Sequence, residues 1–213
     1  MTKRERYEAV IAYFSEAMPM AETELKYENT WQLLVAVMLS AQCTDKRVNM
    51  VTPALFEAYP TPAAMAAATE EEVLAYVKSV SYPNSKARHL VAAAQMLVER
   101  FEGEVPATLE ELTSLPGVGR KTANVVMSVA FGQARMAVDT HVFRVSHRLG
   151  LVPEKAKTPL AVELELVKNI PEAMIPKAHH WLILHGRYVC TALKPRCLEC
   201  GIQHACAYYV KKS

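Results

Sequence analysis

The stretch Leu115-Pro116-Gly117-Val118-Gly119-Arg120-Lys121-Thr122-Ala123 decides the fold of this chain. A helical segment that ends near Ser114 precedes it, and an apolar helical pattern follows it directly. Two glycines within three residues allow positive φ angles and a close approach of the backbone to another group. The stretch therefore predicts two helices joined by a tight turn, over residues 109–132.

This turn has the features of a phosphate site. It opens a helix, whose free N–H groups and dipole favour an anion. Backbone donors at Gly117, Val118 and Gly119 would hold a nucleic-acid strand without reading its sequence, with Arg120 beside them. A plain connection between two helices accounts for the same residues, so both interpretations stay open on physical grounds alone.

Two ionisable residues near the turn are candidates for catalysis. Lys121 lies just inside the second helix, where the helix dipole and Arg120 both disfavour the protonated amine, as a nucleophile requires. Asp139 precedes a further helical pattern and is a candidate N-cap. Its carboxylate could also take a proton from Lys121 or stabilise developing positive charge. A solvated lysine and a simple helix cap are the alternative interpretations.

The composition is that of a folded, helical protein. The chain has 213 residues, of which 51% are hydrophobic and 22% charged, and these fractions exclude intrinsic disorder. Only 7 glycines and 12 prolines are present, which disfavours a β-sandwich or propeller. The net charge of +2 means that any nucleic-acid site must be a local patch.

The hydropathy pattern predicts an all-α protein without a membrane span. The longest apolar run, Trp31 to Leu39, is too short to cross a bilayer, and the N-terminus lacks the apolar region of a signal peptide. We expect an intracellular protein. Helical periodicity predicts nine to eleven helices, and no alternating strand pattern is evident. Asp45, Thr69 and Thr108 are expected helix caps.

Four of the five cysteines form a cluster near the C-terminus. Cys190, Cys197, Cys200 and Cys206 have the spacing C-x6-C-x2-C-x5-C, which in an intracellular chain indicates metal or iron–sulfur ligation. Zinc stays open on the residue types alone, although zinc sites more often use two C-x2-C pairs. The fifth, Cys43, is expected to be a buried small residue with no ligand role.

The turn, Lys121, the segment Val138-Asp139-Thr140-His141-Val142 and the cysteine tail together resemble the endonuclease III family of helix-hairpin-helix DNA glycosylases. The resemblance covers nearly the whole chain. It implies an all-α fold with two helical lobes and a DNA-binding cleft between them. One lobe would be a six-helix bundle over residues 22–133, and the other would combine residues 1–21 with 134–213.

The resemblance also implies a role for individual residues. Lys121 would be the nucleophile that marks the bifunctional branch, with Asp139 opposite it. The four cysteines would hold a [4Fe-4S] cluster that presents the basic residues Lys194 and Arg196 to phosphates. Gln42 would enter the duplex where the damaged base has left.

A second loop implied to contact DNA departs from the family pattern. Val80-Ser81-Tyr82-Pro83-Asn84-Ser85-Lys86-Ala87 corresponds to a family loop that usually reads Ile-Gly-Leu/Phe-Tyr-Asn-x-Lys-Ala. Ser81 therefore replaces a glycine and Pro83 an aromatic residue. The residue that wedges into the duplex would be Tyr82, whose ring can stack on bases.

The function implied is base-excision repair. A monomeric enzyme would bind double-stranded DNA that contains damaged bases or abasic sites, remove oxidised pyrimidines and cut the strand 3′ to the abasic site by β-elimination. A related mismatch-specific glycosylase and a non-catalytic helix-hairpin-helix DNA-binding protein are the alternatives. No membrane partner is expected, and the enzyme would act in the cytoplasm, associated with the nucleoid.

Overall fold

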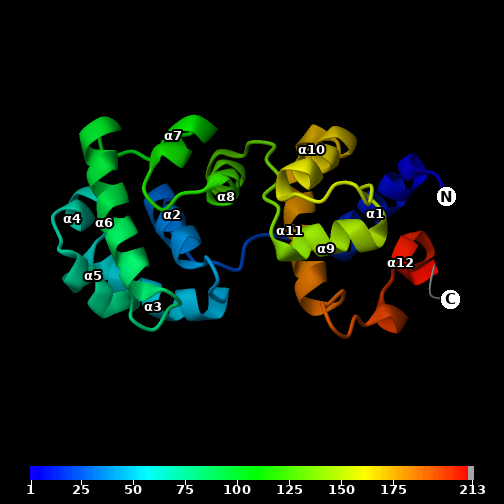
Figure 1. The fold of residues 1–213 in the computed structure, drawn as a ribbon, viewed down its shortest axis with the longest axis horizontal. Coiled ribbons are helices and arrows are strands. Elements are labelled where there is room, and N and C mark those ends of the chain that lie inside the picture. The colour runs from blue at the N-terminus through cyan, green and yellow to red at the C-terminus, as the bar shows by residue number, and fades with distance from the viewer. Residues whose placement is uncertain (211–213) are drawn as a thin grey trace. The chain divides into compact units, whose positions relative to one another are not determined.

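The computed structural model describes residues 1–210, and every regular element in them is helical. This confirms the predicted all-α class. The α-helices are α1 Lys3–Ala17, α2 Thr30–Leu39, α3 Asp45–Ala58, α4 Pro62–Ala66, α5 Glu70–Val77, α6 Pro83–Arg100, α7 Leu109–Ser114, α8 Arg120–Phe131, α9 Thr140–Leu149, α10 Pro159–Asn169, α11 Ile175–Tyr188 and α12 Ala207–Val210 (Figure 1). Three short 3-10 helices, η1 Glu172–Met174, η2 Cys197–Glu199 and η3 Gln203–Ala205, complete them. The predicted number was too low because α4 and α12 are too short for a helical period to show.

The chain divides into two compact units. Unit 1 comprises Met1–Thr23 and Gln133–Ser213, and unit 2 comprises Glu24–Gly132. The first and last parts of the sequence therefore fold together. None of the helices in residues 1–210 has the length and hydropathy to cross a membrane.

Unit 2 is built around α2, whose nine residues from Trp31 to Leu39 are all buried. Helices α6 and α8 pack against α2, and α4 and α5 lie along α6, the longest helix of the unit (Figure 1). A helix that is apolar on all sides can be stable only where neighbours surround it. The α2 sequence thus accounts for its central place in this unit.

Threonine residues are the N-caps of several helices of unit 2. Thr69 and Glu72 form a reciprocal capping box at α5, and Thr108 caps α7 through the backbone N–H of Glu111. These two predicted caps are confirmed. The predicted cap Asp45 was wrong by one residue, because the Thr44 side chain accepts from the Arg47 N–H and Asp45 is the first helical residue.

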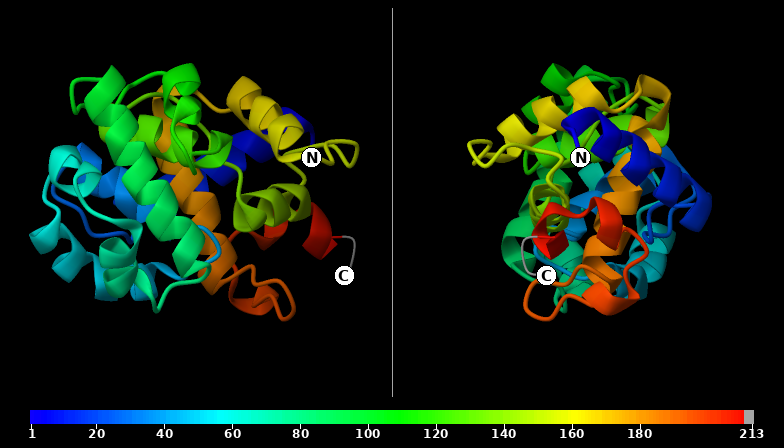
Figure 2. Two further views of the ribbon diagram at one scale, coloured as in Figure 1. Left: turned by 60° about the vertical axis from the view of Figure 1, so that its left-hand side comes forward. Right: turned by 90° about the vertical axis from the view of Figure 1, so that its right-hand side faces the viewer.

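Unit 1 has a separate hydrophobic core. Phe14 of α1 is fully buried and stacks on Trp181 of α11 with ring centroids 6.0 Å apart. Helices α9 and α11 pack closely, and the short C-terminal helix α12, red in Figure 2, contacts α9. Burial of these aromatic surfaces attaches the N-terminal helix to the C-terminal half of the sequence.

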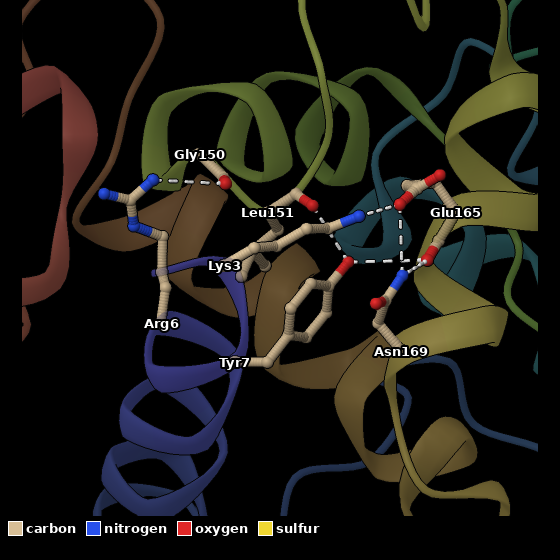
Figure 3. A network of polar contacts seen from close by, with 7 residues as sticks. All are labelled: Lys3, Arg6, Tyr7, Gly150, Leu151, Glu165 and Asn169. Carbon is tan, nitrogen blue, oxygen red and sulfur yellow. Dashed lines mark hydrogen bonds and ion pairs between the residues drawn. The ribbon is translucent and has the colours of Figure 1, made fainter. Parts of the chain in front are cut away.

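Polar contacts also fix α1 in this unit (Figure 3). The buried Tyr7 hydroxyl donates to the Leu151 carbonyl oxygen at 3.0 Å, and Arg6 donates to the Gly150 carbonyl oxygen at 3.3 Å. Lys3 forms an ion pair with Glu165 of α10. Burial raises the pKa of Tyr7, so its hydroxyl keeps its proton and remains a donor.

Candidate functional site

The predicted helical hairpin is formed by α7, the turn Leu115–Gly119 and α8. Leu115 and Val118 are buried and fasten the turn to unit 2. Gly117 has a φ of +79°, and a Cβ atom there would lie 2.7 Å from the Cβ of His89 on α6. Only glycine fits this position, because both the backbone conformation and the lack of space disfavour a side chain.

The backbone donors of the turn are not equivalent. The Val118 N–H donates to the Leu115 carbonyl oxygen at 3.1 Å, so it already has a partner within the turn, where the sequence suggested a donor to DNA. Gly119 is the N-cap of α8 and supplies no side-chain cap, while its carbonyl oxygen accepts from the Ala123 N–H at 2.9 Å. Gly117 and Gly119 are both exposed at the surface.

Lys121 is exposed in the first turn of α8, directly after the hairpin turn. The next residues, Thr122 and Ala123, are buried, so the helix is anchored while its lysine faces solvent. Arg120 is also exposed. The positive end of the helix dipole and two cationic side chains therefore occur together at this surface of unit 2.

Asp139 caps α9 in unit 1. Its Oδ1 accepts a hydrogen bond from the Val142 N–H at 2.8 Å, as the sequence predicted. The residue is half-buried, and the three residues before it, Met136 to Val138, are buried. The backbone and the cap thus fix the position of this carboxylate before any substrate binds.

Gln42 and Tyr82, both in unit 2, share an unusual backbone conformation. Their φ angles are +53° and +52°, and both residues are exposed, Tyr82 to 63%. Cys43, beside Gln42, is half-buried rather than buried as expected. Sequence reasoning assigned no role to Lys86, whose buried ammonium group contacts the segments on which Gln42 and Tyr82 lie.

The four C-terminal cysteines line one cavity in unit 1, together with Leu149 and His185. Burial raises the pKa of the Cys200 and Cys206 thiols, and the nearby Cys190 and Cys197 raise it further. The fold therefore brings together four cysteines that intervening stretches of six, two and five residues separate in the sequence. Four ligands of one shared metal group must lie close together in this way.

This cavity fits a polynuclear cluster. Within residues 1–210, no three His, Cys, Asp or Glu side chains are grouped closely enough to hold a single metal ion. A four-iron cluster binds each cysteine through a separate iron atom, so its ligands surround a space and need not converge on one point. Four soft thiol donors around one cavity meet that requirement.

Arginines from α9 hold the cysteine segment in place. Arg148 donates to the Thr191 and Ala192 carbonyl oxygens at 2.7 and 2.8 Å, and its Nη1 lies 3.5 Å from the Cys190 Sγ. Arg144 donates to the Cys190 carbonyl oxygen at 3.1 Å. These contacts were not evident from the sequence, because the partners are more than forty residues apart.

The two basic residues of this segment differ in their surroundings. Lys194 is exposed, whereas the exposed Arg196 forms an ion pair with Glu199 and donates to the Tyr188 carbonyl oxygen at 3.3 Å. An ion pair at the surface contributes little to stability, but it lowers the local positive charge that Arg196 presents to an anion. Lys194 is the better candidate for a phosphate contact.

Comparisons with known proteins agree with this arrangement. Residues 35–172 match the family described as "HhH-GPD superfamily base excision DNA repair protein". The chain is 49% identical over 201 residues to "Endonuclease III" of Rickettsia prowazekii, covering 94% of each chain, and 45% identical over 211 residues to "Endonuclease III" of Escherichia coli K12, covering 99% of each. It also resembles the solved "Structure of a Trapped Endonuclease III-DNA Covalent Intermediate: Estranged-Adenine Complex", with a TM-score of 0.93 and 44% identity over 100% of this chain and 99% of that one. The chain belongs to the endonuclease III family within the HhH-GPD superfamily of base excision DNA repair proteins.

Proposed function

We propose that this protein is a bifunctional DNA N-glycosylase and abasic-site lyase that removes oxidised pyrimidines from double-stranded DNA. The observation that carries the proposal is the exposed Lys121 at the start of α8, directly after a glycine turn suited to a DNA backbone. A non-catalytic DNA-binding module would leave this lysine and Asp139 without a task. Chromosomal DNA as substrate implies action in the cytoplasm, at the nucleoid.

The first step is exposure of the damaged nucleotide. Turning a base out of the stack costs a few kcal/mol, least for a damaged base, which favours the lesion over normal DNA. Gln42 would fill the space left in the duplex, since its amide can donate and accept hydrogen bonds to the unpaired base. Tyr82 would stack beside it. Gly117, Gly119 and Arg120 would bind the backbone.

The chemical steps use the Lys121 amine. Its unprotonated nitrogen attacks C1′ of the sugar, the C1′–N bond breaks, and the base leaves with the bonding electrons and takes up a proton. Asp139 stabilises the positive charge that develops on the sugar and accepts the proton that the amine releases. Opening of the sugar ring then gives an imine between Lys121 and C1′.

Strand cleavage follows from the imine. The imine acidifies the C2′ proton, whose removal expels the 3′ phosphate as the C3′–O bond breaks. Water hydrolyses the remaining imine and restores the amine. One nucleophile therefore performs both base removal and strand cleavage.

The four cysteines of unit 1 would hold a [4Fe-4S] cluster. When bound, that cluster would fix the fold of the segment Cys190 to Cys206. The chain's own contribution is the position of Lys194, which would contact a phosphate without reading sequence. Iron and acid-labile sulfide analysis of the purified protein, with its visible absorption, tests this ligation. Zinc without sulfide would overturn it.

Trapping with borohydride tests the catalytic proposal. Wild-type protein incubated with a duplex containing an abasic site and sodium borohydride should give a covalent protein–DNA adduct, since the reagent reduces the imine. Lys121→Ala should give none, while Lys155→Ala, at another exposed lysine, should match the wild type. Absence of an adduct with the wild type, or an equal yield from Lys121→Ala, would refute the mechanism.

Duplexes that carry a single damaged or mismatched base in place of the abasic site measure the lesion preference. Release of thymine glycol should exceed release of uracil opposite guanine and of adenine opposite 8-oxoguanine. Preferential release of one of the mismatched bases would instead identify a mismatch glycosylase.

A further inference from the structure

A buried lysine connects two segments of unit 2. Lys86 is 8% exposed, and its Nζ donates to the Leu39 carbonyl oxygen at 2.7 Å, the Ala41 carbonyl oxygen at 2.8 Å and the Ser81 hydroxyl oxygen at 3.0 Å. An ammonium group has three N–H donors and no acceptor. All three donors of Lys86 are therefore used within the protein, and none is left for a ligand.

The acceptors belong to two different parts of the chain. Leu39 is the last residue of α2, Ala41 lies two residues beyond it, and Ser81 lies in the segment before α6. The Ser81 hydroxyl lies 2.8 Å from the Gln42 carbonyl oxygen and donates to it. The end of α2 presents carbonyl oxygens without helical partners and the negative end of the helix dipole, which together stabilise a buried cation.

This connection lies beside the two exposed residues with positive φ angles. Gln42 directly follows Ala41, and Tyr82 directly follows Ser81. Left-handed backbone is unfavourable for residues other than glycine and persists where the surroundings enforce it. Within residues 1–210, Glu102 is the only other non-glycine residue with a positive φ, so two of the three such residues directly follow a residue that Lys86 contacts.

We propose that Lys86 is a positioning residue that holds the Gln42 and Tyr82 segments together in the conformation that enters damaged DNA. The inference rests on the proposed function, because it takes both side chains as contacts with the duplex. Lys86 does not touch the substrate. It acts by keeping two strained segments at a fixed separation, so that one side chain fills the vacant base position while the other stacks beside it.

A lysine is suited to this position for chemical reasons. Its long flexible stem reaches from α6 to the end of α2, and one ammonium group can satisfy acceptors that point from three directions. Burial lowers the pKa of Lys86, while the nearby Cys43 thiol opposes that shift. A methionine of similar length would fill the space but leave the three acceptors without their donor.

Binding measurements on the full-length protein separate this role from general stabilisation. The duplexes are one that carries a tetrahydrofuran abasic analogue, with 2-aminopurine opposite it, and an undamaged duplex of the same length. Lys86→Met should weaken binding to the abasic duplex about tenfold or more, a free-energy loss of about 1.4 kcal/mol, with binding to the undamaged duplex changed less than about twofold. The 2-aminopurine fluorescence change on binding should fall with it.

Leu97→Ala is the matched control, since Leu97 is a fully buried core residue farther along α6. It should lower the melting temperature of the protein but leave the ratio of the two affinities and the fluorescence change at wild-type values. If Lys86→Met does not fold, Ser81→Ala decides. It removes one acceptor of Lys86 and the donor to Gln42, and it should reduce the affinity ratio about threefold.

Three results have distinct meanings. A wild-type affinity ratio in the folded variant, or an equal loss on both duplexes, would show that Lys86 only stabilises the fold and would overturn the inference. A wild-type protein that does not prefer the abasic duplex would refute the proposed function itself, and the inference with it. Loss of the ratio with an intact borohydride adduct on an abasic site would support both.

Discussion

The Oδ1 atom of Asp139 accepts a hydrogen bond from the backbone N–H of Val142 at 2.8 Å. The carboxylate proposed to act in catalysis is therefore also the N-cap of α9. A loss of activity on its removal could come from a lost charge or from a disturbed helix. The two effects are separable, because asparagine caps helices as well as aspartate does and carries no charge.

Asp139→Asn should keep the stability of the wild type within a few tenths of a kcal/mol, while Asp139→Ala should lower it by about 1 kcal/mol. Both variants should lose base-release activity about a hundredfold, because neither can stabilise positive charge on the sugar or take a proton. Urea unfolding and single-turnover release of thymine glycol measure the two quantities. An active Asp139→Asn protein would contradict the proposed role of the charge.

Gly117→Ala should destabilise unit 2 by more than the cost of its backbone conformation. A positive φ costs a non-glycine residue about 1–2 kcal/mol, and the new Cβ would also press on His89. Gly103→Ala is the matched control, with a φ of +80° and no atom within 4 Å of the added Cβ, and it should show the conformational cost alone. Thermal unfolding compares them. Equal losses would mean that His89 moves aside without cost.

Lys194→Ala should weaken DNA binding equally for all sequences. Removal of one phosphate contact should reduce the slope of log K against log salt by about 1, because one fewer counterion is released on binding. Lys155→Ala, at another exposed lysine of unit 1, should leave the slope unchanged. Titrations of an undamaged duplex at several salt concentrations provide the measurement, and an unchanged slope for Lys194→Ala would exclude the contact.

His180 should make the fold less stable as the pH falls. Burial, reinforced by Arg187, lowers its pKa to about 4 in the folded protein, whereas an unfolded histidine titrates near 6.5. Between these values the unfolded chain binds more protons, so the stabilisation present above about pH 6.5 is lost progressively down to about pH 4, by at most about 3 kcal/mol.

His180→Gln should therefore reduce the dependence of unfolding free energy on pH between about 5 and 7 without abolishing it, in denaturant titrations at each pH, because burial lowers the pKa of His185 to about 4 as well. Arg187→Gln should keep most of the dependence, because burial is the larger cause of the shift. A wild-type slope in His180→Gln would show that the folded histidine titrates as it does in the unfolded chain.

Local patterns in the sequence were sufficient to predict the fold class and the N-termini of several helices. Thr69 and Thr108 cap their helices through atoms three residues away, so the pattern lies within a short window. The same holds for the hairpin turn, whose glycines are two residues apart. The family assignment, made from that turn, the segment around Asp139 and the cysteine spacing, is confirmed by the relatives. The roles of the individual site residues stay predictions.

Only the tertiary structure decided which distant residues support those motifs. Lys86 donates a hydrogen bond to the carbonyl oxygen of Leu39, 47 positions away in the sequence. Gly117 must be glycine because His89 of another helix occupies the space beside it. The N-terminal helix joins the C-terminal half because Phe14 packs on Trp181. Hydrophobic periodicity and capping describe interactions along one segment, whereas these contacts depend on how separate helices pack, which no local pattern records.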